Sequence, residues 1–383
     1  MSETNTDNIN RSYLIGYNDV LGWEVRHYFT FYGEFRRTND VLPYVEAILL
    51  SIIFLVAVTG NVLVLIILCT ARRRHLTSNY FIANLALASI LTVSFVPLAA
   101  VTRITETWIF GSGLCSLTVY TEYSGAIITV WTMTILSIDR HRRSCRKTAL
   151  TARTVIIVLG SLWILVVPSG VPLAMFFVIR KFPIGSGMVD ICTLVWPNVE
   201  NFRVSVVFAV PSVLVMFVIP LVVISLNYIR VMKTLKASVR KFKSGRLSRD
   251  WPQASQSARG GLLVASHKEI RVVRFLILLV ILFCVFWMPI SVSFLLILYD
   301  GFSNVLIMTS QYFVTSVGLA MMNACVSPVV YAFVNERYRY GLRKLFRKMK
   351  KRPKVNNVVR PLPVFVINAP RDNDIMVKDR IPK

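Results

Sequence analysis

Long blocks of apolar residues dominate the hydrophobic pattern of this chain, and short polar or basic segments separate them. A helix needs ~20 residues to cross a hydrocarbon core of about 30 Å. Seven blocks are this long, with bounds 43–70, 79–102, 113–140, 153–179, 204–233, 270–298 and 304–334. Because backbone groups in lipid must be satisfied within the spanning structure, each block is predicted to be a helix. The expected fold is therefore an all-α membrane protein, a bundle of seven transmembrane helices.

The segments outside the bundle of residues 43–334 differ in character. Residues 1–42 form the N-terminal tail, whose polar and acidic opening MSETNTDNIN lacks the basic-then-apolar start of a cleavable signal peptide, so the first block is expected to direct insertion. Residues 335–350 alternate basic and apolar positions at helical spacing, which predicts a short amphipathic helix on the membrane lipids. Residues 351–383 are basic, and we expect them to be disordered.

The formal net charge of +25 is concentrated next to the ends of the apolar blocks. The basic clusters are 72–74, 140–147, 233–274 and 337–354. The positive-inside rule assigns these clusters to the cytosol and the N-terminus to the outside. We therefore expect a multi-pass protein of the plasma membrane, with an extracellular N-terminus. Binding to nucleic acid is not expected, because the charges lie beside predicted membrane helices.

The cysteines divide by side of the membrane. Cys115 and Cys192 are the two that this topology puts outside, where disulfides form, so we predict a bond between them. The others are expected to be free: Cys69, Cys145, Cys284 and Cys325. A sequon at Asn10 in the outer tail predicts glycosylation there.

Short motifs follow one another along the blocks in a defined order. They are Gly60-Asn61-Val62, residues 84–88 (NLALA), Trp108-x-Phe110-Gly111, Asp139-Arg140-His141, Trp163, Pro220 with Tyr228, Phe283-x-x-x-Trp287-x-Pro289 and Pro328-x-x-Tyr331. With this set the chain resembles the class A (rhodopsin-like) G-protein-coupled receptors over residues 43–350. The resemblance implies a receptor that transmits an extracellular signal to a heterotrimeric G protein.

The resemblance also implies a set of residues that switch such a receptor between its inactive and active states. These are Asp139, Arg140, Tyr228, Glu269, Phe283, Trp287, Pro289, Pro328 and Tyr331. Arg140 stays charged and needs acidic partners, for which Asp139 and Glu269 are the candidates. A ligand pressing on Trp287 would bend its helix at Pro289, where a backbone hydrogen bond is missing. The alternatives are that Arg140 is one more positive-inside arginine and that Trp287 only fills space.

Some positions depart from the family pattern. Ser89 and Ser327 replace an aspartate and an asparagine, so a cluster with Thr129 and Asn323 contains no anion. We therefore expect no bound sodium. The loop between the third and fourth blocks is short and lacks the usual proline, which leaves the strength of G-protein coupling open. The tail after Tyr331 has no Ser, Thr or Cys, so contact with arrestin would depend on serines of the third inner loop.

Two charges face the expected ligand pocket. Arg103 ends the second block and Glu122 lies about two turns into the third; such membrane charges indicate a functional site. The alternative is that they pair with each other. Residues 103–108, 190–197 and 228–238 resemble the long-chain (omega-3) free fatty acid receptor family. That resemblance implies a carboxylate on Arg103 and an apolar channel, for which the candidate residues are Tyr123, Trp196, Trp287 and Phe313.

Glu122 weakens this ligand assignment, because it would repel a carboxylate unless it were neutralised. The alternatives are a neuropeptide or biogenic amine receptor with Glu122 as counter-ion, or a weakly coupling decoy. An enzyme is not expected, and neither is a metal or cofactor, because the histidines have no catalytic or ligand spacing: His27, His75, His141 and His267. Residues 304–334 contain no lysine for a retinal Schiff base.

Overall fold

The computed structural model describes most of the bundle and part of the N-terminal tail. The described residues are 13–18, 23–28, 40–70, 77–146, 148–184, 187–195, 204–243, 270, 273–274, 277–278, 280–293, 295, 310–334 and 336–350. The chain divides into two units, Met1–Leu342 and Arg343–Lys383. The first unit contains every contact discussed below.

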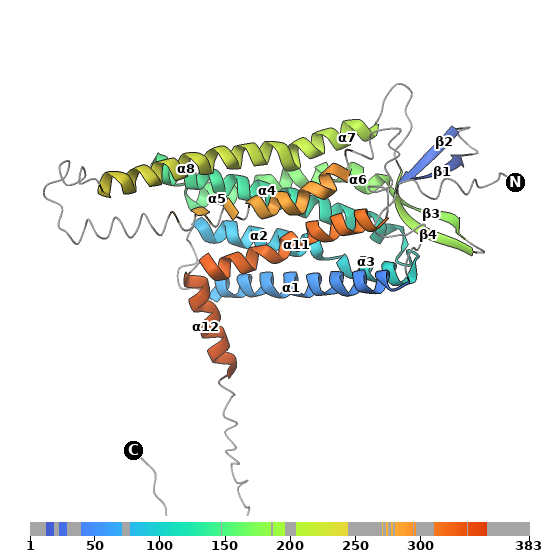
Figure 1. Ribbon diagram of the computed structural model, residues 1–383, viewed down its shortest axis with the longest axis horizontal. Helices are drawn as coiled ribbons and strands as arrows, with labels where there is room; N and C mark the ends of the chain where they lie inside the picture. Colours follow the sequence, from blue (N-terminus) through green and yellow to red (C-terminus); the bar gives the residue numbers. More distant parts are fainter. Residues whose placement is uncertain are drawn as a thin grey trace, which may run out of the picture. The chain divides into compact units, whose positions relative to one another are not determined.

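Helices account for most of the described residues (Figure 1). They are α1 (Leu42–Thr70), α2 (Thr77–Val93), α3 (Val96–Thr105), α4 (Gly111–Cys145), α5 (Ala152–Ser169), α6 (Val171–Phe176), α7 (Val204–Val213), the π-helical turn η2 (Leu214–Val218), α8 (Ile219–Lys243), α11 (Ser310–Val334) and α12 (Glu336–Lys350). A further helix, Val280–Ser293, precedes α11 in the chain. Each of the seven predicted blocks thus contains a helix.

Several of these helices have the length and composition of membrane spans. Among the described residues, four stretches are long and apolar enough: Leu42–Thr70, Thr77–Thr105, Ala152–Phe176 and Val206–Arg240. Val280–Ser293 and Thr315–Val329 are shorter apolar helices. The 35-residue α4 is longer than a span requires, but it carries charged side chains. It packs against α2, α5, α6 and α8, and its charges include the buried Asp139 as well as the exposed Arg143.

Several blocks end at residues that the hydrophobic pattern does not predict. The second and third run on to Thr105 and Cys145, past the predicted ends at 102 and 140. The fourth helical stretch stops at Phe176, because Phe177 begins a strand, so the predicted bound of 179 is three residues too far. The fifth continues to Lys243, ten residues past the predicted end at 233. The added residues are mainly good helix formers such as Lys, Arg, Leu and Ala, and Leu235 and Val239 among them still pack in the buried cluster that contains Tyr228.

A four-stranded antiparallel sheet lies at one end of the bundle, and the hydrophobic pattern gave no sign of it (Figure 1). Its strands are β1 (Tyr13–Asn18), β2 (Trp23–Tyr28), β3 (Phe177–Ile184) and β4 (Gly187–Leu194), in the order β1-β2-β4-β3. The two hairpins meet at the pair Tyr28–Leu194. A hairpin from the N-terminal tail therefore extends the hairpin that follows α6.

Buried apolar clusters fill the described part of the bundle, and two of them lie toward its opposite ends. The first includes Trp108, Cys115 and Leu194 and lies next to the sheet. The second includes Phe81 and Tyr228 and lies at the opposite end. Between helices the packing is close: a Cβ on Gly60 would come within 2.7 Å of Pro328 Cγ, so α1 and α11 touch through this glycine. Small residues permit such contacts between membrane helices.

Candidate functional site

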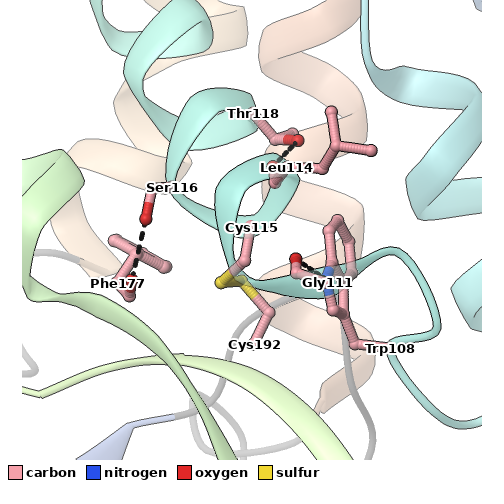
Figure 2. The surroundings of a disulfide bond; sticks show 8 residues. All are labelled: Trp108, Gly111, Leu114, Cys115, Ser116, Thr118, Phe177 and Cys192. Carbon is pink, nitrogen blue, oxygen red and sulfur yellow. Dashed lines mark hydrogen bonds between the residues drawn. A yellow bond between two sulfur atoms is a disulfide. The ribbon is translucent and has the colours of Figure 1, made fainter.

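Cys115 and Cys192 form a disulfide that joins the start of α4 to β4, as predicted (Figure 2). We call this end of the bundle the disulfide end. Hydrogen bonds hold the hairpin beside the disulfide: Ser116 Oγ donates to Phe177 O at 3.1 Å, and the Trp108 backbone N–H donates to Asp190 O at 2.7 Å. The indole N–H of Trp108 donates to Gly111 O at 2.9 Å (Figure 2). The β3–β4 hairpin is thus fixed to α4 by the disulfide and the Ser116 hydrogen bond, and to the segment before α4 by the Trp108 backbone.

Arg103 is buried at the disulfide end, where it forms an ion pair with Glu46. Arg103 Nη2 lies 2.7 Å from Glu46 Oε2. Its Nε donates to the same oxygen at 2.8 Å. The side chains are 1% and 12% exposed. The pair joins α3 to α1. The partner suggested by the sequence was Glu122, and that pairing stays a prediction. Glu46 was missed because it lies 57 residues away in the sequence, in the first turns of α1.

Tyr123 and Trp287 each belong to a pair of aromatic rings that borders the buried cluster beside this end. Tyr123 OH lies 3.2 Å from Ser212 Oγ, and the Tyr123 ring packs against Phe208 with centroids 5.7 Å apart. Trp287 stacks on Phe283 at 5.9 Å. Tyr123, Phe208 and Trp287 all pack against the same buried apolar cluster. Glu122 precedes Tyr123 on α4 and is half-buried.

Several predicted site residues are not part of this geometry. Asn10, Trp196 and Glu269 lie outside the described residues. The backbones of Phe313 and Tyr331 are helical within α11, but their side chains lie outside the described part of the chain. The roles predicted for these five residues therefore stay predictions.

Asp139 and Arg140 lie near the other end of α4. The Asp139 carboxylate accepts from Arg143 Nε at 2.7 Å and from the Leu150 backbone N–H at 3.2 Å. Arg140, expected to pair with the adjacent Asp139, lies within electrostatic reach of the buried Tyr228. Asp139 therefore binds the arginine one turn further along its own helix.

His141 takes the third place of the Asp139-Arg140-His141 motif. Burial lowers the pKa of His141, and the positive charges of Arg230 and Arg146 lower it further. Because the ordinary pKa of histidine is about 6.5, the ring is neutral near pH 7. The cluster at this end therefore holds arginine charges and no additional histidine charge.

Polar side chains are buried in the middle of the bundle between these two ends. Asn84 Nδ2 donates to Thr132 Oγ1 at 2.7 Å, and Trp163 Nε1 donates to Asn84 Oδ1 at 2.8 Å, which ties α2, α4 and α5 together. Ser89, Thr129, Asn323 and Ser327 are all buried. In the described part of the chain, Asn323 Oδ1 and Ser327 Oγ have no hydrogen-bond partner. Within that same part, no group of three or more His, Cys, Asp or Glu side chains could hold a metal ion.

A sequence profile described as the 7 transmembrane receptor (rhodopsin family) matches residues 60–331. The chain belongs to this family. The receptor is 30% identical to Free fatty acid receptor 4 of Mus musculus over 84% of its own length and 87% of the relative's. It is 28% identical to the Substance-P receptor of Aquarana catesbeiana, over 78% of this chain and 69% of the relative.

Its fold is similar to that in a crystal structure of squid rhodopsin, with a TM-score of 0.69 at 17% identity, covering 84% of this chain and 90% of that one. The predicted seven-transmembrane bundle is confirmed. As a member of this family, the protein is a multi-pass membrane receptor that couples an extracellular ligand to a G protein. It is not an enzyme.

Proposed function

We propose that this receptor is activated by a long-chain free fatty acid, with the disulfide end and the N-terminus facing the outside of the plasma membrane. The observation that carries the proposal is the buried ion pair of Arg103 with Glu46: a carboxylate already occupies this guanidinium at 2.7 Å. The planar fork of arginine is suited to carboxylates. The likeness to Free fatty acid receptor 4 of Mus musculus supports the same ligand class.

The aromatic rings of Tyr123, Phe208 and Trp287, which border one buried cluster, suit the acyl chain of such a ligand. These rings pack against aliphatic residues of the same cluster, including Ile290 and Met321. Ligand sites are mostly apolar, with a few polar groups that fix orientation. In this proposal the acyl chain supplies most of the affinity, and Arg103 orients the carboxylate.

Glu46 gives the proposal a specific mechanism. A ligand carboxylate that reaches Arg103 competes with Glu46, which is the more exposed member of the pair. Removing the Glu46 charge should therefore strengthen binding of an acid, because the competing anion is gone. A neutral ester should not gain, since it has no charge to exchange.

The N-terminal hairpin occupies one strand edge to which an extended peptide could add. A peptide that adds to a sheet as a further strand needs an unpaired strand edge. Here β2 pairs with β4 at Tyr28 and Leu194, so the receptor's own tail occupies part of that edge.

A neuropeptide or amine ligand is the second candidate function. Glu122 is half-buried one residue before Tyr123, where it could neutralise a ligand cation. The similarity to the Substance-P receptor of Aquarana catesbeiana favours the peptide class.

The test is a cell assay of calcium and cyclic AMP with an 18-carbon unsaturated fatty acid, its methyl ester, biogenic amines and neuropeptides. Wild-type receptor should respond to the acid. Glu46→Gln should raise the potency of the acid about tenfold, the worth of one charge-assisted hydrogen bond, and leave the ester unchanged. Glu122→Gln should keep the acid response. A response to amines or peptides alone, lost in Glu122→Gln, would establish the second candidate instead.

A further inference from the structure

Two hydroxyl groups meet among the apolar side chains beside the disulfide end. Tyr123 OH of α4 lies 3.2 Å from Ser212 Oγ of α7. Tyr123 also borders a second buried cluster, which includes Ile127, Ile128 and Val166. A hydroxyl among apolar side chains needs hydrogen-bond partners. The way in which these two groups share their hydrogen atoms therefore decides what a ligand beside them would meet.

The direction of the hydrogen bonds follows from the number of hydroxyl hydrogens. Ser212 has one, and it donates this hydrogen to the Phe208 carbonyl oxygen at 2.7 Å, one turn back on α7. Serine in a helix can make such a bond to its own backbone. Ser212 has no second hydrogen for Tyr123, so the phenol is the donor in the 3.2 Å contact. The hydrogen bonds thus run from Tyr123 to Ser212 to Phe208.

The phenol oxygen of Tyr123 is left as an acceptor at the start of this series. Among the described residues, no group donates a hydrogen bond to it. Its ring packs on Phe208 with centroids 5.7 Å apart, which fixes where the oxygen lies. A ligand group that donates a hydrogen atom fits beside this oxygen, whereas a group that only accepts finds no free hydrogen on Tyr123 or Ser212.

One apolar cluster connects Tyr123 with the surroundings of Arg103. The cluster includes Ala99 and Ala100, which lie one turn before Arg103 on α3, and Tyr123 packs against it from α4. An acyl chain whose carboxylate is held by Arg103 would follow this cluster toward Tyr123. A hydroxyl on such a chain is costly to bury unless it finds a hydrogen-bond partner, and the Tyr123 oxygen supplies one.

We propose that the preferred ligand of this receptor is a long-chain fatty acid with a hydroxyl group along its acyl chain, and that this hydroxyl donates to the Tyr123 oxygen. The inference rests on the proposed function, which supplies the acid, and adds the substituent. A keto group at the same carbon has no hydrogen to donate, and it would have to displace the bond from Tyr123 to Ser212. Tyr123 is thus a specificity-determining residue for hydroxy acids over keto acids.

The test compares potencies in the calcium and cyclic AMP assay. The probes are an 18-carbon fatty acid, positional isomers with one mid-chain hydroxyl, and the keto acids of the same positions. One hydroxy isomer should be about fivefold more potent than the parent acid, the worth of one neutral hydrogen bond. Its keto counterpart should not exceed the parent acid.

Two variants alter these hydrogen bonds, and ratios of potency within one variant cancel differences in expression. Tyr123→Phe removes the oxygen, so the ratio of hydroxy acid to parent acid should fall to one or below. Ser212→Ala leaves the Tyr123 hydrogen free for a ligand, so the keto acid should gain and approach the hydroxy acid. Tyr120→Phe is the matched control on α4 and should change neither ratio, because Tyr120 OH donates to Val167 O of α5 at 2.9 Å.

The outcomes separate this inference from the proposed function. A receptor that responds to no acid overturns both. A response to the parent acid that no hydroxy isomer exceeds overturns this inference alone, and so does a hydroxy preference that survives in Tyr123→Phe. If Tyr123→Phe fails to fold, Ser212→Ala decides, and a keto acid that gains nothing there overturns the inference.

Discussion

The two ends of the bundle each contain a carboxylate bound to an arginine at 2.7 Å, yet the two ion pairs are built differently. Arg103 and Glu46 come from different helices and are 1% and 12% exposed. Asp139 and Arg143 lie one turn apart on a single helix, and Arg143 is 36% exposed. A buried pair across helices is costly to break, whereas a half-exposed pair within a helix contributes little. The first pair can hold two helices together, and the second pair can break and re-form at little cost.

The contacts around the two ion pairs also differ between the two ends. At the disulfide end, a covalent bond joins the hairpin to α4, and a backbone hydrogen bond joins it to Trp108 in the segment before α4. The opposite end is held between α4 and α8 by side-chain contacts, such as Asn227 Nδ2 to Ser137 Oγ at 3.1 Å. Side-chain contacts can exchange partners without unfolding a helix. An end that is fixed suits ligand recognition, and an end that can rearrange suits contact with a G protein.

Breaking the pair at the disulfide end should have the largest effect. Arg103→Ala leaves Glu46 without its arginine in a mostly buried position, and loss of one partner of a buried pair costs about 3–5 kcal/mol of stability. Thermal unfolding of the purified receptor should show this loss. The double variant Arg103→Ala/Glu46→Ala should recover most of it, and the exposed Arg180→Ala should match wild type. A double variant as unstable as Arg103→Ala would mean that burial of charge is not the cause.

An intermediate effect is expected between the two ends, where α2 and α4 touch. A Cβ on Gly125 would lie 3.0 Å from both the Ala88 carbonyl oxygen and the Thr92 backbone nitrogen. Overpacking of this kind costs about 1–3 kcal/mol, so Gly125→Ala should lower the melting temperature. Gly160→Ala on α5 is the matched control, because its Cβ would meet nothing within 4 Å of the described structure. Equal melting temperatures for the two variants would show that α2 and α4 can separate without cost.

The smallest effect concerns sodium, for which we predict no response at all. The buried residues Ser89, Thr129, Asn323 and Ser327 include no carboxylate to neutralise the ion. Replacing choline chloride with sodium chloride at equal ionic strength should not change the melting temperature of the wild type. Ser89→Asp should create a sodium dependence. Stabilisation of the wild type by sodium would show that hydroxyl and amide oxygens suffice.

Block length and charge were enough to predict the helices and the disulfide, because both follow from the membrane itself. The sheet could not be predicted from block length and charge. Residues 177–179 continue an apolar block, and only pairing with β4 makes them a strand. The β1–β2 hairpin is joined to β4 across more than 160 residues, and no local pattern encodes such a contact.

Only part of the candidate site could be predicted from the sequence, for similar reasons. Arg103 stood out as a charge at the end of an apolar block, but its partner Glu46 belongs to another helix. The Asp139–Arg143 pair was different, because i,i+4 spacing is visible in the sequence. The sequence analysis nevertheless assigned Arg140, the neighbour of Asp139 in the family motif, as its partner instead of Arg143.

The strand pair Tyr28–Leu194 makes the tail and the hairpin after α6 a single composite epitope. An antibody raised against the isolated peptide 13–28 would meet that segment in its free form, whereas a conformational binder selected on the folded receptor would cover both chain segments at once. Such a binder would report whether the two hairpins stay joined when ligand enters, without any label on the receptor.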